Sequence, residues 1–169
     1  MYDIVYFSPT GNTKYLAKHL AINLGVESKH VFPLEFTQND ALNPNNHLVL
    51  MYSIHGFNAP RTVKRFVKNL PIITQGTVSL LSIGCNTIWF NDAVSKDLKK
   101  QLIKKGYQII VDEVVAMPLT FVMDFPKETK ETLVAEGTNL MVELSDKIRK
   151  QTVSTRKVKF KSKAINLIG

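Results

Sequence analysis

The segment His47–Ser53 (HLVLMYS) is apolar at nearly every position, and this feature constrains the fold more than any other. A strand with one face in water alternates apolar and polar residues. A continuous apolar run indicates instead a strand that is covered on both faces. Tyr2–Phe7 (YDIVYF) and residues 78–84 (VSLLSIG) have the same character. Such strands occur in parallel sheets with helices packed on both sides, so we expect an α/β fold.

Segments with helical periodicity lie between these strands. In Asn12–Leu24, apolar side chains recur at spacings of three and four, and Gly25 follows as a helix stop. Pro60 is well placed to open a second helix. Two further helices are expected over residues 92–105 and from about 127 to 150.

Two more strands complete the alternation. Residues 30–33 form a weak strand that belongs at a sheet edge, because Pro33 has no backbone donor. Residues 107–115 form the last strand. The chain is therefore predicted to fold as a doubly wound, five-stranded parallel sheet in the order 2-1-3-4-5.

The composition agrees with one ordinary globular unit. The chain has 169 residues, enough to bury a core without disulfides or structural metal. Cys85 is the single cysteine, which excludes a disulfide framework or an iron–sulfur cluster within the chain. The sequence shows no membrane-spanning run and no signal pattern, so we expect a cytoplasmic protein. We expect one domain over residues 1–150 and a basic tail or linker over 151–169.

Positive charge is concentrated near the C-terminus. From Lys147 onward there are eight basic and no acidic residues: Lys147, Arg149, Lys150, Arg156, Lys157, Lys159, Lys161 and Lys163. The net charge of +8 equals this excess, so residues 1–146 are formally neutral. Such a tail suits nucleic acid, an anionic membrane or an acidic protein, and a solvated linker is the alternative interpretation.

Residues 8–13 (SPTGNT) join the first strand to the first helix and carry the strongest functional signal. Four side chains of this loop offer hydroxyl or amide groups: Ser8, Thr10, Asn12 and Thr13. Gly11 permits close backbone approach, and a helix N-terminus favours an anion. The loop contains no lysine or arginine, so it predicts a phosphate site built from neutral donors. The patterns GxGxxG and GxxxxGK[ST] are absent, and a simple capped helix start is the alternative.

This loop resembles the FMN-phosphate loop of the flavodoxins. The segments HGFNAP (55–60) with RTVKRFVKNLP, SIGCNTIWFND (82–92) and the Met117-Pro118 pair are similar to the flavodoxin-like domain of fused flavodoxin–ferredoxin proteins. The resemblance covers about residues 1–150. It implies an FMN-binding electron-transfer protein, a one-electron carrier through the flavin semiquinone and hydroquinone. It also implies a redox partner protein, of ferredoxin type or acidic.

In a sheet of this order the ligand lies at the carboxyl ends of the strands, where three loops converge. The first loop supplies Ser8, Thr10, Gly11, Asn12 and Thr13. The second supplies Ser53, Ile54, His55, Gly56 and Phe57, and the third supplies Gly84, Cys85, Asn86, Trp89, Phe90 and Asn91. Trp89 is the favoured stacking partner of the flavin ring. Phe57 and Phe90 are alternatives, which are equally consistent with anchoring their loops in the core.

Two residues of the second loop have specific implied roles. Flavodoxin-like proteins hold the semiquinone by turning a peptide near the flavin N5, and Gly56 resembles the glycine of that turn. A simple turn glycine is the alternative. His55 departs from the acidic surroundings typical of flavodoxins, and a protonated imidazole there would favour the reduced, anionic flavin. An ordinary exposed histidine is the alternative.

Two other functions remain open at this point. One is an FMN-dependent NAD(P)H:quinone-type reductase. The other is a non-catalytic flavodoxin-like interaction module that uses the basic tail. The sequence contains no Ser–His–Asp set, paired carboxylates or metal-ligand spacing, so we expect no catalytic side chain and no metal site. No Cys-rich ferredoxin segment follows the flavodoxin-like region, which leaves a stand-alone relative or a fragment as possibilities.

Overall fold

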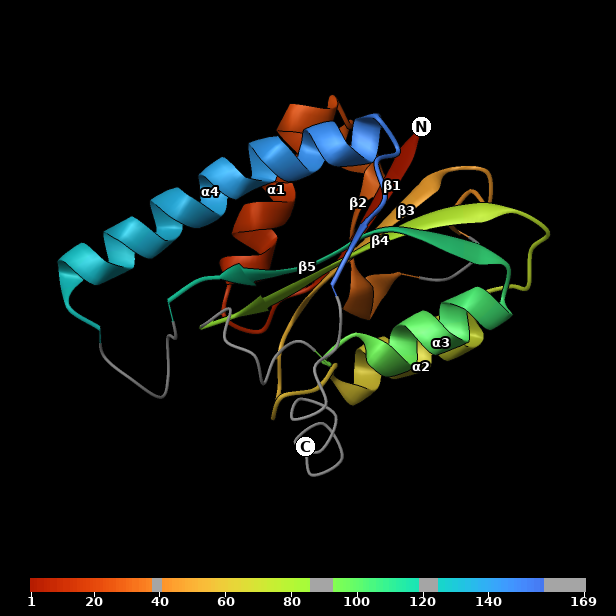
Figure 1. Cartoon of the computed structure of the whole chain (residues 1–169), viewed down its shortest axis with the longest axis horizontal. Coiled ribbons are helices and arrows are strands. Elements are labelled where there is room, and N and C mark those ends of the chain that lie inside the picture. Colours follow the sequence, from red (N-terminus) through yellow and green to blue (C-terminus); the bar gives the residue numbers. More distant parts are fainter. Residues whose placement is uncertain (38–40, 86–92, 119–124, 157–169) are drawn as a thin grey trace.

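The computed structural model describes residues 1–37, 41–85, 93–118 and 125–156. Its sheet has six strands in the order β2-β1-β3-β4-β5-β6, and every pairing is parallel (Figure 1). The strands are β1 (Tyr2–Phe7), β2 (Val31–Pro33), β3 (His47–Ser53), β4 (Gly76–Gly84), β5 (Tyr107–Ala116) and β6 (Ser154–Thr155). The α/β class and the parallel sheet are therefore as the sequence predicts.

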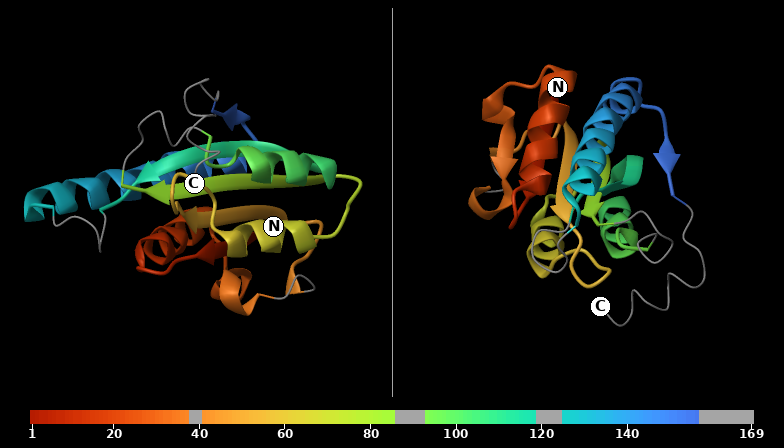
Figure 2. Two further views of the ribbon diagram at one scale, coloured as in Figure 1. Left: turned by 90° about the horizontal axis from the view of Figure 1, so that it is seen from below. Right: turned by 90° about the vertical axis from the view of Figure 1, so that its left-hand side faces the viewer.

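Helices cover both faces of this sheet. On one face lie α1 (Asn12–Leu24) and α4 (Lys127–Arg149), and on the other lie α2 (Arg61–Asn69) and α3 (Lys96–Lys104) (Figures 1 and 2). Two short 3-10 helices, Ser28–His30 and Leu34–Phe36, flank β2. The N-terminal half of α4 extends beyond the carboxyl ends of the strands (Figure 1).

Strand β3 shows why its sequence is apolar throughout. Leu48, Leu50 and Tyr52 pack into the core under α2 and α3, whereas Val49 and Met51 pack into the core under α1 and α4. All five side chains are at most 5% exposed. Because successive side chains of a strand point to opposite faces, a strand between two helical layers needs apolar residues at both parities.

The prediction of five strands is wrong by one. Ser154 and Thr155 form β6, which pairs with Val111 and Asp112 at the outer edge of β5. A strand of two residues is too short to show a periodicity, and its basic surroundings are typical of a tail. The sequence alone therefore does not distinguish this strand from a linker.

A buried carboxylate holds the start of the C-terminal segment. Asp112 is fully buried, and the Arg156 guanidinium donates to both its backbone oxygen and its carboxylate at 3.2 Å. The Ser95 hydroxyl donates to the same carboxylate at 2.6 Å, and the Lys99 ammonium forms an ion pair with it. Arg156 is thus part of the fold, since it helps to neutralise a charge that burial would otherwise penalise.

Helices long and apolar enough to cross a membrane do not occur in the described part of the chain.

His47 makes the stability of the protein depend on pH. The imidazole is 5% exposed and lies within 2.8–2.9 Å of the Thr77 and Ser79 hydroxyls. Burial, aided by the positive N-terminus, lowers the pKa of His47 to about 4. In the unfolded chain, His47 is protonated near the ordinary histidine pKa of about 6.5. The contribution of neutral His47 to stability is therefore fully present above that pH and is lost as the pH falls towards 4.

We expect the free energy of unfolding to fall by about 2 kcal/mol between pH 7 and pH 5 because of His47. Urea denaturation at the two pH values measures this difference. The His47→Gln variant should lose that component, since glutamine does not titrate, whereas His19→Gln should behave as wild type. An unchanged pH dependence in His47→Gln would show that other groups cause the acid sensitivity.

Candidate functional site

The carboxyl ends of β1, β3 and β4 lie at one edge of the sheet. In the register, Phe7 pairs with Tyr52 and Ser53 with Ile83. The Ile54 N–H donates to the Ile83 carbonyl at 2.8 Å and extends this ladder by one residue. The loops that follow these strands therefore begin side by side, which is the arrangement that the strand order predicts.

The first loop ends at Gly11, whose backbone is in the left-handed region. Gly11 has φ 95° and precedes α1, whose first helical hydrogen bond runs from the Tyr15 N–H to the Gly11 carbonyl at 2.9 Å. Only glycine adopts such a φ without strain, which explains its place in the loop. The Lys14 N–H donates to the Ser8 hydroxyl oxygen at 2.9 Å, so Ser8 satisfies one of the N–H groups in the first turn of α1. The N-cap residue itself, Gly11, has no capping side chain.

Several donors of this loop make no hydrogen bond to any other described residue. These are the hydroxyls of Thr10 and Thr13 and the backbone N–H groups of Asn12 and Thr13. Thr13 is 1% exposed, whereas Thr10 and Gly11 are exposed. The loop therefore combines unused neutral donors with the positive end of a helix dipole, which is the chemistry that binds a phosphate.

Asn12 joins the first loop to the segment that follows β5. Its side-chain amide donates to the Pro118 carbonyl at 2.7 Å, and the Met117 N–H donates to the Gly84 carbonyl at 2.7 Å. The Met117-Pro118 pair thus contacts both the first loop and the end of β4. In the sequence only the resemblance to flavodoxin-like domains points to this pair, whereas in the structure it contacts two of the predicted site segments.

The second loop contains a tight hairpin at residues 55–58. His55 and Asn58 exchange two backbone hydrogen bonds at 3.0 Å. The central residues Gly56 and Phe57 have φ values of 52° and 60°, as in a type I′ turn. A glycine followed by a bulky residue suits instead a type II′ turn, in which only the first central residue has positive φ. Phe57, 43% exposed, is therefore held in a strained conformation.

His55 lies on the α2 side of this hairpin. Its Nε2 is 3.1 Å from the Ser53 hydroxyl oxygen, and its ring meets that of Phe7 edge-on at 5.7 Å. A hollow of about 420 Å³ adjoins it, lined by Phe7, His55, Asn58, Ala59, Pro60, Arg61, Thr62 and Lys64. The lining contains two permanent cations and no acidic residue.

The third loop is described only at its start. Gly84 and Cys85 are half-buried, and Cys85 is a free thiol. Asn86, Trp89, Phe90 and Asn91 lie outside the described residues. The stacking role of Trp89 therefore stays a prediction. Within the described ranges, no cluster of three or more histidine, cysteine or acidic side chains could hold a metal ion.

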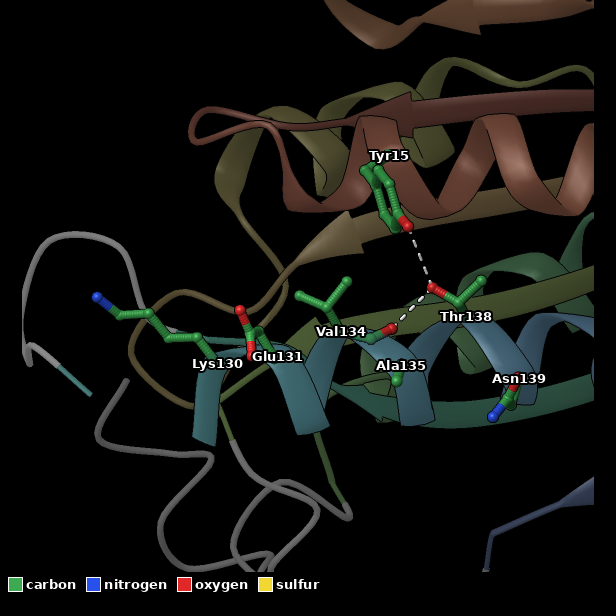
Figure 3. Close-up of a pocket in the computed structure, with 7 residues that line it drawn as sticks. All are labelled: Tyr15, Lys130, Glu131, Val134, Ala135, Thr138 and Asn139. Carbon is green, nitrogen blue, oxygen red and sulfur yellow. Dashed lines mark hydrogen bonds between the residues drawn. The ribbon is translucent and has the colours of Figure 1, made fainter. Parts of the chain in front are cut away.

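A second hollow, of about 460 Å³, lies between α1 and α4 (Figure 3). It is lined by Tyr15, Lys130, Glu131, Val134, Ala135, Thr138 and Asn139. The Thr138 hydroxyl contacts the Tyr15 hydroxyl at 3.4 Å and the Val134 carbonyl at 2.7 Å. None of the predicted site residues lines this hollow, and no sequence signal points to it, because it arises from the packing of two helices far apart in the chain.

No family model matches the chain, and no curated protein matches its sequence. Solved structures do match its fold. A WrbA-like flavodoxin from Agrobacterium tumefaciens has a TM-score of 0.59 at 9% identity, covering 89% of this chain and 98% of its own. A flavodoxin from Streptococcus pneumonia TIGR4 has a TM-score of 0.58 at 17% identity, with coverages of 86% and 98%.

A flavodoxin from the domain Archaea has a TM-score of 0.56 at 14% identity and covers 88% of this chain and 99% of its own. At such identities the likeness concerns the fold alone, and the suggested relation to fused flavodoxin–ferredoxin proteins stays a prediction. Sheet order, helical layers and these three structures together show that the chain has the flavodoxin-like fold.

Proposed function

We propose that this protein binds FMN at the carboxyl edge of β1, β3 and β4 and carries electrons, one at a time, to or from a partner protein. The observation that carries the proposal is the loop of residues 8–13, with its unpaired neutral donors at the start of α1. The structural neighbours, two of them called flavodoxins and one a WrbA-like flavodoxin, support the same cofactor.

The residues of the first loop fit a phosphate monoester. The hydroxyls of Thr10 and Thr13 and the N–H groups of Asn12 and Thr13 would donate to its oxygens. The absence of a cation within the loop suits a phosphate that is bound by donors and a helix dipole. FMN, when bound, supplies the redox chemistry, while the protein binds, orients and tunes it.

The hairpin at residues 55–58 could also close in a second conformation, which differs from the observed one by the orientation of one peptide. Turning the Gly56–Phe57 peptide converts a type I′ turn into type II′, reverses the Gly56 carbonyl and brings φ of Phe57 to a negative value. The bonds between His55 and Asn58 can persist, because both turn types close the same hairpin. Left-handed strain at Phe57, about 1–2 kcal/mol, therefore favours the turned peptide. We infer that the turned Gly56 carbonyl would accept a hydrogen bond from the N5–H of the reduced flavin.

We expect Phe57→Asn to lower the first midpoint potential of the bound flavin by about 40 mV. Asparagine tolerates the left-handed conformation, so the variant loses about 1 kcal/mol of bias towards the turned peptide. Phe57→Ala removes the ring but keeps the left-handed penalty, so it is the matched control and should shift the potential less. Equal shifts in the two variants would assign the effect to the ring and not to strain.

Turnover separates the proposed carrier from a reductase. Purified protein loaded with FMN is mixed with NADH or NADPH and a quinone, and pyridine nucleotide oxidation is followed. We expect no rate beyond that of free FMN, together with rapid oxidation of the reduced protein by a one-electron acceptor. Sustained turnover would identify a reductase instead. A protein that binds no FMN would support the interaction module.

A further inference from the structure

Helices α2 and α3 carry an excess of positive charge that the formally neutral composition of residues 1–146 conceals. Seven cations on these helices are exposed or half-exposed, and we call them the basic face: Arg61, Lys64, Arg65, Lys68, Lys96, Lys100 and Lys104. Asp97 is the single acidic residue of the two helices. Lys99 is excluded from the set, because it pairs with buried Asp112.

Among the residues that the structure describes, no carboxylate pairs with the basic face. No ion pair within the described ranges joins any of its seven cations to a carboxylate. In contrast, α4 balances its charges along its own surface, for example by pairing Lys127 with Glu131 and Lys147 with Glu143. Because the two helical layers lie on opposite sides of the sheet (Figures 1 and 2), the folded protein has a basic side that its sequence composition does not reveal.

The basic face reaches the edge of the proposed flavin site. Helix α2 begins directly after the 55–58 hairpin, and Arg61 and Lys64 line the hollow of about 420 Å³ beside His55. A partner that exchanges electrons with a flavin at this edge would approach over the hairpin. The cations of α2 and α3 therefore lie where they can steer that approach.

We propose that the basic face docks an acidic surface of a partner protein, with carboxylate side chains entering the hollow beside α2. This rests on the proposed FMN site, but places the docking surface on the folded helices and not on residues 157–169. A protein partner fits better than nucleic acid, because the two helices expose no aromatic side chain for base stacking. Side chains can also fill a hollow that a flat bilayer cannot enter.

The test compares two variants of equal net charge. The first replaces four cations of α2 with glutamine: Arg61→Gln, Lys64→Gln, Arg65→Gln and Lys68→Gln. The control replaces four exposed lysines elsewhere: Lys18→Gln, Lys29→Gln, Lys127→Gln and Lys150→Gln. Binding of an acidic [2Fe–2S] ferredoxin is measured by calorimetry at low salt and at about 0.15 M salt, where exposed charges are screened beyond about 8 Å.

We expect the α2 variant to bind this ferredoxin at least about tenfold more weakly at low salt, and the control to stay within about threefold of wild type. Deletion of residues 157–169 should have a smaller effect than the α2 variant. Failure of wild type to bind the ferredoxin, equal losses in the two variants, or loss of binding on tail deletion alone would overturn the proposal. Tighter binding of duplex DNA or phosphatidylserine vesicles through the same cations would also overturn it.

An FMN titration of the same proteins separates this proposal from the proposed function. Wild type and both variants should all bind FMN, because none of the replaced residues lies in the first loop; Arg61 and Lys64 lie only at the edge of the site, so the α2 variant should stay within about threefold of wild type. If ferredoxin binding depends on the basic face but FMN does not bind, the proposed function fails and the docking surface stands. If FMN binds and ferredoxin binding ignores the basic face, the docking proposal alone fails.

Discussion

Removal of residues 152–169 should destabilise the protein by about 2–3 kcal/mol. The deletion removes β6 and the Arg156 guanidinium, and so leaves the fully buried Asp112 carboxylate with two of its three side-chain partners. Breaking a buried ion pair costs about 3–5 kcal/mol when nothing replaces the lost partner. We expect a smaller loss of stability here, because Lys99 and Ser95 still contact the Asp112 carboxylate. Urea denaturation measures the difference.

The matched control is removal of residues 157–169, which retains β6 and Arg156. The sequence predicts a basic tail or linker here, so we expect the shorter deletion to keep wild-type stability. Arg156→Met, which keeps a long side chain but removes the charge, should reproduce most of the loss caused by the longer deletion. Wild-type stability in both Arg156→Met and the longer deletion would show that the Arg156–Asp112 pair is dispensable.

Thr13→Val should weaken FMN binding about 5- to 150-fold. Valine keeps the buried, branched shape of threonine but removes the hydroxyl, and losing a hydrogen bond to a charged phosphate costs about 1–3 kcal/mol. Thr10→Val should have an effect of the same size and direction. Quenching of FMN fluorescence on titration gives the dissociation constants.

The Thr13→Ser variant and the binding of riboflavin provide the controls for these variants. Thr13→Ser restores a hydroxyl and should recover most of the affinity for FMN. Riboflavin has no phosphate, so its weaker binding should be the same in wild type and in Thr13→Val. If Thr13→Val weakens FMN and riboflavin equally, the substitution damages the fold or the ring site, and the hydroxyl does not bind the phosphate.

The regular elements were largely predictable because local signals and tertiary packing agree. Helix α1 spans Asn12–Leu24 as predicted, because Gly11 and Gly25 lie at its two ends and its apolar stripe has helical spacing. Helix α3 begins at Lys96 and not at residue 92, although an apolar stripe extends further back through Val94. Such a stripe predicts burial, but it does not fix the residue at which a helix begins.

Features that depend on long-range contacts were not predictable. The sequence shows Arg156 in a basic run, and only the fold brings it to Asp112, 44 residues away. The strain at Phe57 has a local origin instead: it arises within the four-residue hairpin between His55 and Asn58, whose turn type the sequence does not determine. The charge of the basic face is visible in the sequence, but its segregation from α4 follows from the layer arrangement alone.

The most direct test of the central claim is the affinity of the purified wild-type protein for FMN compared with riboflavin. Both ligands carry the same ring, so the ratio of their dissociation constants isolates the phosphate and hence residues 8–13. We predict saturable one-to-one binding of FMN, and binding of riboflavin at least about a hundredfold weaker, as expected when several donors lose a charged acceptor. Equal affinities for the two flavins, or no binding of FMN, would contradict the account.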